Sequence, residues 1–315
     1  MTNLEKSIFV TLVYYDLLNR PLTALEIYKY LPALIGEVSF FEFKRTLENS
    51  LVLKKYLRSR FGLYFLNQRQ DLISQREKRL KLAQLKWKKL IKSVRQLTFV
   101  PFLRLIAATG SLTAYNTRSQ SDFDLLIVIR EGRLWLTRAL VTALTALLGV
   151  RRHGPLTQNR ICLNCYLTEN QLEIKTEAKP RDYHSVQEYG RLTPILEIKP
   201  GLYQQFCQAN QWLKGFLNFY PWPNEKNAKR IKPNRLANLI RRFLEWLLAG
   251  KIGEGLEKAL GQWQTSRINR KPGFAPADQI FISSSCLMFH PQSKSYELMK
   301  LFHQRMEQLT ASDNQ

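Results

Sequence analysis

The sequence predicts an α+β protein of several domains, and three observations lead to this prediction. The chain has 315 residues, whereas one domain typically has about 150. Short apolar runs typical of strands lie between residues 100 and 179, and helical periodicity dominates on both sides of them. Basic residues are concentrated in the first third of the chain. We therefore expect a helical domain at 1–69, a basic linker helix at 70–99, an α/β domain with a small mixed sheet at 100–179, and a helical region at 180–315.

The first segment begins with three predicted helices. Apolar residues recur at helical spacing over Leu4–Leu18. Thr23 with Glu26, and Ser39 with Glu42, both match the pattern in which a hydroxyl and a carboxylate cap the first amides of a helix. Two further helices are therefore expected to begin after Thr23 and Ser39.

A predicted hairpin closes this segment. Leu51–Leu57 and Gly62–Leu66 have the composition of short strands, and the turn between them contains Arg58 and Arg60. Three helices followed by a hairpin with a basic tip resemble a winged helix. The resemblance covers residues 1–69 and implies a module that contacts nucleic acid or another protein.

Positive charge is the unusual feature of the composition. The chain contains 48 Lys and Arg against 25 Asp and Glu, a net charge of +23. Residues 51–95 carry 14 basic residues against two acidic ones, Asp71 and Glu77, and so contribute +12. Such a field attracts polyanions, and nucleic acid is one candidate partner. The alternative is a solvated basic helix face beside a protein-contact module. The residues expected to contact nucleic acid are Arg58, Arg60, Lys86, Lys88, Lys89 and Lys92.

The middle of the chain shows an alternation of strands and helices. Strands are expected at Phe102–Ala108, Asp124–Ile129 and Ile161–Leu167. The apolar run Leu134–Val150 is interrupted by Arg138 and is shorter than the ~20 apolar residues of a membrane span, so it predicts a buried helix.

The last segment is predicted to be helical. A loop is expected at Pro272–Pro276. The expected helices are Ile195–Tyr220, Leu236–Leu248, Gly255–Gln264 and Tyr296–Leu309.

The first residues and the small number of cysteines predict a cytoplasmic protein. The first residues lack the basic and apolar regions of a secretory signal, and four cysteines are too few for a disulfide framework. Cys162 and Cys165 form a single CxxC in a strand-like run, which predicts core packing rather than a metal site.

Two half-motifs carry the chemistry of the sequence. An apolar strand runs into Gly110-Ser111, where a residue without Cβ allows close approach of an anionic group. Ten residues later, Asp122 and Asp124 are two apart in an apolar strand, so their side chains share one face. Two adjacent carboxylates repel each other unless a cation lies between them, and oxygen ligands suit Mg²⁺.

This arrangement resembles the nucleotidyltransferase superfamily, which includes DNA polymerase beta and the minimal bacterial nucleotidyltransferases. The resemblance covers residues 100–178. It implies that Gly110 and Ser111 bind the triphosphate of an NTP and that Asp122 and Asp124 bind Mg²⁺ or Mn²⁺. The implied reaction transfers a nucleoside monophosphate to a hydroxyl by two-metal catalysis, with a small molecule, a protein or RNA as acceptor.

One part of the superfamily pattern is absent. Polymerases of this group carry a third carboxylate on a later strand. Asn164 is the expected occupant of that position here, and Glu173 is the nearest substitute. The alternative function is therefore a catalytically inactive protein of the same fold that binds nucleic acid or acts as an adaptor through its winged helix.

Overall fold

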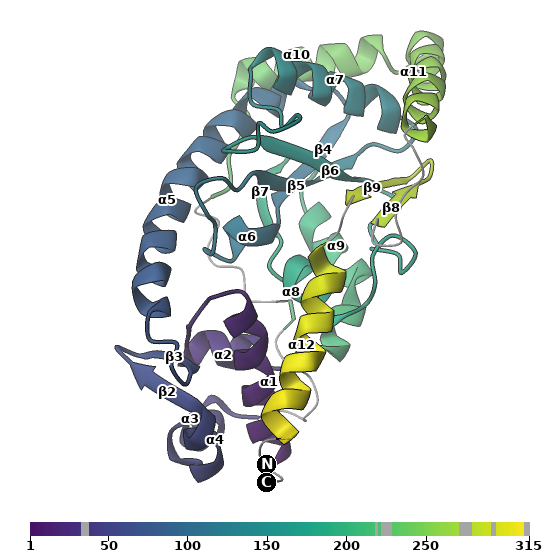
Figure 1. Cartoon of the computed structure of the whole chain (residues 1–315). Helices are drawn as coiled ribbons and strands as arrows, with labels where there is room; N and C mark the ends of the chain where they lie inside the picture. Colours follow the sequence, from purple (N-terminus) through teal and green to yellow (C-terminus); the bar gives the residue numbers. More distant parts are fainter. Residues whose placement is uncertain (33–37, 218–219, 222–228, 271–278, 291–293, 312–315) are drawn as a thin grey trace.

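The fold combines helices with two β-sheets in a mixed α/β arrangement. The computed structural model describes residues 1–32, 38–217, 220–221, 229–270, 279–290 and 294–311. This described part contains twelve α-helices and a three-stranded and a six-stranded sheet (Figure 1). Within it, no helix has both the length and the apolar character needed to cross a membrane.

The N-terminal unit consists of four helices and a small antiparallel sheet with strand order β1-β3-β2. Both expected helix starts are confirmed, because the Thr23 and Ser39 hydroxyls accept the amides of Glu26 and Glu42. The elements are α1 (Asn3–Leu17), β1 (Leu22–Thr23), α2 (Ala24–Tyr30), α3 (Phe40–Asn49), α4 (Leu51–Tyr56), β2 (Leu57–Arg60) and β3 (Leu63–Leu66).

The predicted strand at Leu51–Leu57 is wrong, because Leu51–Tyr56 form α4 and Leu57 begins β2. The Ser50 hydroxyl accepts the amide of Leu53 and begins this helix, a cap that the apolar composition of the run concealed. A hairpin is present, but its first strand is β2, so Arg58 and Arg60 lie on this strand and not in the turn as expected. Strand β2 pairs with β3 around Phe61 and Gly62, both at positive φ.

The central sheet is mixed, as expected, and has the strand order β7-β4-β5-β6-β9-β8. Strands β5 and β6 are parallel, and the other neighbours are antiparallel. The linker helix α5 (Leu72–Gln96) leads into the sheet through a short 3₁₀ turn (Leu97–Phe99). The strands are β4 (Leu103–Ala108), β5 (Phe123–Ile129), β6 (Ile161–Thr168), β7 (Thr193–Glu197), β8 (Gln279–Ile282) and β9 (Cys286–His290).

The expectation of a purely helical region at 180–315 is wrong, because this region supplies β7, β8 and β9. The predicted helix at Ile195–Tyr220 is instead β7, α9 (Leu202–Ala209) and a 3₁₀ helix (Gln211–Gly215). Ile195 and Leu196 are buried in the sheet, where β7 pairs with β4, and this strand pairing determines their conformation. The loop expected at Pro272–Pro276 lies outside the described residues. The remaining helices are α6 (Gly110–Thr113), α7 (Leu134–Leu147), α8 (Tyr183–Tyr189), α10 (Arg235–Leu247), α11 (Lys251–Asn269) and α12 (Lys294–Ala311).

Both faces of the central sheet are buried. Along β5, Leu126 and Val128 join one apolar cluster, whereas Leu125 and Ile127 join another. The first cluster also contains α1, α2 and α8, so the N-terminal unit shares a core with one face of the sheet. Helices α7, α10 and α11 lie on the opposite side (Figure 1).

Candidate functional site

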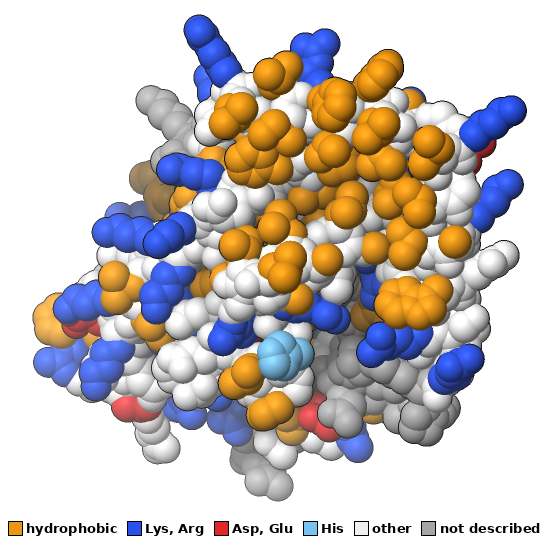
Figure 2. All heavy atoms as spheres, turned by 90° about the horizontal axis from the view of Figure 1, so that it is seen from above, with side chains coloured by type: hydrophobic (Ala, Val, Ile, Leu, Met, Phe, Trp, Pro, Cys, Tyr) orange, Lys and Arg blue, Asp and Glu red, His pale blue; other side chains and the backbone are white. Residues whose placement is uncertain are grey.

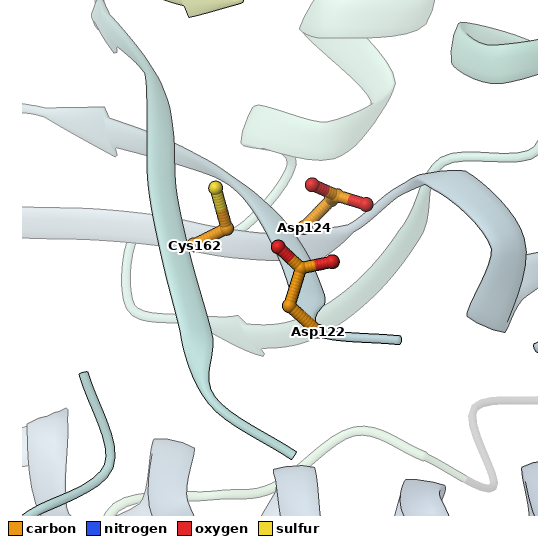
Figure 3. A group of neighbouring side chains, drawn as sticks. All are labelled: Asp122, Asp124 and Cys162. Carbon is orange, nitrogen blue, oxygen red and sulfur yellow. The ribbon is translucent and has the colours of Figure 1, made fainter. Parts of the chain in front are cut away.

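The two half-motifs meet at one end of β5. Asp122 directly precedes this strand, and Asp124 is its second residue, so the two side chains emerge on the same side, as expected. Cys162 at the start of β6 lies opposite Asp124 in the parallel pairing. A carboxylate oxygen from each aspartate and the Cys162 Sγ lie within 4.8 Å of one another (Figure 3).

Gly110 brings the other half-motif against this group. Its φ is +70°, and a Cβ at this position would lie 2.6 Å from Oδ2 of Asp124. The amide of Thr109 also donates to the backbone oxygen of Asp124 at 3.0 Å. Only glycine therefore permits the turn after β4 to approach the carboxylate so closely. Ser111 follows directly and borders the cavity, described below, that opens around this group.

The charge on Asp124 is unfavourable in the free protein. Burial, followed by the nearby carboxylates of Asp122 and Glu188, raises the pKa of Asp124 to about 7. The amide of Asn164 donates to Oδ1 of Asp124 at 3.2 Å, and Arg152 donates to Oδ2 of Asp122 at 2.6 Å. A cation placed between the two aspartates would offset the repulsion that raises this pKa.

The donor atoms suit a hard divalent cation. Burial and the two aspartates raise the pKa of the Cys162 thiol to about 12, so at neutral pH the sulfur keeps its proton. The remaining donors are carboxylate oxygens, which Mg²⁺ and Mn²⁺ prefer. The prediction that Cys162 packs in a core is wrong, because the residue borders the site; Cys165 is buried, as expected.

Of the two residues expected at the third carboxylate position, one lies in the site and the other lies outside it. Asn164 lies in the site and contacts Asp124. The Glu173 side chain is 45% exposed and pairs with Arg181 at 2.8 Å, and it does not border the cavity. Glu188 of α8 does border it, paired with Lys179 at 3.0 Å. Sequence spacing contains no signal for Glu188, because α8 is far from both half-motifs in the chain and packs in the apolar cluster shared by the N-terminal unit and the sheet.

A cavity of about 1250 Å³ opens around these groups. Three carboxylates border it, and basic side chains outnumber them two to one. The basic residues are Arg118, Arg138, Arg151, Arg152, Lys179 and Arg191. The cavity thus combines a focal acidic pair with a cationic wall, a combination that suits a polyanionic ligand carrying divalent cations.

His184 of α8 also borders this cavity. Its Nδ1 lies 2.7 Å from the hydroxyl of Tyr14, which belongs to α1. Burial lowers the pKa of His184, so the imidazole is neutral at pH 7. The N-terminal unit therefore helps to build the site.

The residues expected to contact nucleic acid do not form one group. Lys86 is buried, and its Nζ donates to the backbone oxygens of Ser119 and Ser121 at 3.0 and 2.6 Å. Its assignment to a nucleic-acid surface is therefore wrong, because the amine anchors the loop that leads into Asp122. Arg58 and Arg60 are exposed on β2, and Lys88, Lys89 and Lys92 are exposed on α5.

No protein-family model, no curated protein and no solved structure matches this chain.

Proposed function

We propose that the chain is a divalent-cation-dependent nucleotidyltransferase, which transfers a nucleoside monophosphate from an NTP to a hydroxyl. One observation carries the proposal: Asp122 and Asp124 converge with the Gly110 turn at the edge of a large cationic cavity. Each half-motif alone is common in structural turns. Their convergence at a carboxylate with a raised pKa is typical of a functional site.

Asp122 and Asp124 would hold Mg²⁺ or Mn²⁺. The bound cation supplies neutralisation of charge on the α-phosphate and on the pyrophosphate leaving group. Arg152 contacts Asp122 in the free protein, and its side chain is 45% exposed. A cation on the aspartates would leave this guanidinium available to contact a phosphate, and Gly110 and Ser111 would offer backbone and hydroxyl donors.

The acceptor hydroxyl then attacks the α-phosphorus as the bond to the β-phosphate oxygen breaks and pyrophosphate leaves. The proton of the hydroxyl requires an acceptor, and the amide of Asn164 cannot take it. Among the described residues that border the cavity, Glu188 is the one carboxylate besides Asp122 and Asp124, and we assign proton acceptance to it.

The test is pyrophosphate release from each of the four NTPs with Mg²⁺ or Mn²⁺, using small hydroxyl compounds, the protein itself and RNA as acceptors. Asp122→Asn should reduce release by about 10³-fold, because it removes a cation ligand. Glu173→Gln is the matched control, since it removes a carboxylate outside the cavity and should leave release unchanged. Release that survives Asp122→Asn would contradict the proposal.

The alternative is a binding protein that has lost the chemistry, and Asn164 in place of an acid favours it. In that case the N-terminal unit, with Arg58 and Arg60 exposed on β2, contacts nucleic acid or a protein. Duplex DNA binding that is intact in Asp122→Asn, together with no nucleotide binding in the native chain, would favour this alternative.

A further inference from the structure

Helix α10 lies with its polar side toward the protein and its apolar side toward solvent. Leu239, Phe243 and Trp246 follow helical spacing and are 67%, 56% and 73% exposed. The inner side is held by polar contacts instead. Glu245 accepts the amide of Phe102 at 2.8 Å and pairs with Arg104 at 2.9 Å.

Helix α11 repeats this inversion. Ile252, Leu256 and Trp263 are spaced along one side and are 67%, 41% and 57% exposed. The inner side carries Leu260, which packs against the core, together with small and polar residues. Gly261 lies against the Trp135 ring, where a Cβ would be 2.9 Å from Cδ1. Glu257 accepts the amides of Trp135 and Leu136 at 2.9 and 2.8 Å. The outward apolar stripes of both helices therefore contribute little to the core of the described chain.

The two outward stripes form one surface, which we term the α10–α11 face. It comprises the exposed apolar side chains of these helices together with Leu147 and Leu148 at the end of α7, which are 85% and 42% exposed. Figure 2 shows apolar side chains gathered over this end of the molecule, with Lys and Arg side chains around their edge. Soluble proteins rarely leave so broad an apolar patch without a partner.

The charge around this face selects the kind of partner. Between residues 235 and 269 the exposed acidic residue is Glu254, and the exposed basic residues are Arg235, Arg242, Lys251, Lys258 and Arg267. A second copy of the chain would bring the same positive charge against it, and each copy already has a net charge of +23. The complementary partner is apolar and anionic.

We propose that the α10–α11 face docks on an anionic lipid membrane. Leu, Phe and Trp side chains enter the boundary between head groups and acyl chains, and the surrounding Lys and Arg contact the anionic head groups. Exposed Trp side chains suit this boundary because the ring is apolar and its N–H remains hydrated. Figure 1 places α10 and α11 at the end of the molecule opposite α1–α4, so the docked chain projects its N-terminal unit away from the membrane.

The test is co-sedimentation of the full chain with vesicles of phosphatidylcholine alone or with about 30% phosphatidylserine. We expect binding to the anionic vesicles that weakens with added salt. The double variant Phe243→Ser, Trp246→Ser should bind at least about tenfold more weakly, because it removes the two largest side chains that enter the lipid. The matched control is Phe41→Ser with Leu51→Ser, which removes two side chains that are each 79% exposed in the N-terminal unit.

Three results would overturn the proposal. The first is no binding to anionic vesicles. The second is equal binding by the Phe243, Trp246 variant and its control, with both folded by circular dichroism. The third is a lipid-independent dimer in analytical ultracentrifugation that the same variant abolishes, which would assign the face to a second copy.

Discussion

Gly110 and Asp124 approach each other so closely that neither can be changed without consequence for the other. A Cβ on Gly110 would lie 2.6 Å from the Asp124 carboxylate, and the φ of +70° is strained for any other residue. We predict that Gly110→Ala lowers the free energy of unfolding by about 2–4 kcal/mol, measured by urea denaturation.

Gly132→Ala separates backbone strain from the clash. Gly132 has a φ of +68°, and its Cβ would meet nothing within 4 Å. This control should therefore lose only about 1 kcal/mol, from strain alone. Equal losses in the two variants would show that the contact with Asp124 does not matter.

Asp124 should reduce the stability of the free protein at neutral pH. Its pKa is raised from 3.8 to about 7, so the folded state resists ionisation, and the penalty grows as pH rises from about 4 to 7. Asp124→Asn should therefore raise the free energy of unfolding by about 2–4 kcal/mol at pH 8. The difference from the native chain should shrink toward zero near pH 4, and urea denaturation at both pH values checks this.

The residues at the centre of the candidate site could be predicted from the sequence, but the residues that surround them could not. The spacing of Gly110, Asp122 and Asp124 reflects contacts within one strand pair, which local sequence determines. Glu188 and Lys179 reach the same cavity through the packing of distant elements. Lys86 is of a residue type that is usually exposed, but it is buried here because its amine donates to two backbone oxygens of the loop before Asp122.

At the scale of elements, α10 depends on one carboxylate. Glu245 accepts the Phe102 amide and pairs with Arg104 and Arg241, while the apolar side of the helix contributes little burial. Glu245→Ala should therefore lower the free energy of unfolding by about 3 kcal/mol, because it leaves the guanidinium of Arg104 less well paired. Glu254→Ala, at an exposed acid of α11, should change it by less than about 0.5 kcal/mol. A similar effect of the two substitutions would show that Glu245 does not anchor α10.

Most helices could be predicted because caps and periodicity are local. The starts after Thr23 and Ser39 follow from hydroxyl and carboxylate side chains three residues apart. Strand β7 was missed because the helix expected at Ile195–Tyr220 ignored the break at Pro200-Gly201. Ile195 and Leu196 lie before this break and are in a strand that pairs with β4. Strand β9, in the region expected to be helical, likewise forms through pairing with distant residues of β6, and β8 pairs with β9.

At the scale of the whole molecule, an ion-pair cluster joins the N-terminal unit to the linker helix α5. Glu26 of α2 pairs with Arg20 and with Arg76 of α5, both at 2.7 Å. Burial opposes ionisation of this carboxyl, but the two guanidiniums outweigh it and lower the pKa of Glu26 to about 2.

The lowered pKa sets the pH range in which Glu26 stabilises the fold. Its contribution is complete above the ordinary value of 4.5 and is lost as pH falls toward about 2. Glu26→Gln should lower the free energy of unfolding by about 2–3 kcal/mol at pH 7, and by progressively less below pH 4.5. Glu48→Gln, at an exposed position of α3, serves as the control, and a pH-independent deficit in the Glu26 variant would refute the assignment.

The most direct measurement of the proposed function is the thermal stability of the chain with each NTP, with and without Mg²⁺ or Mn²⁺. A ligand at about 100 times its dissociation constant adds about 2.7 kcal/mol to the free energy of unfolding. We predict a cation-dependent increase in melting temperature for the native chain and for Glu173→Gln, and none for Asp122→Asn. The absence of a shift with every NTP, or an equal shift in Asp122→Asn, would contradict a nucleotide site at Asp122 and Asp124.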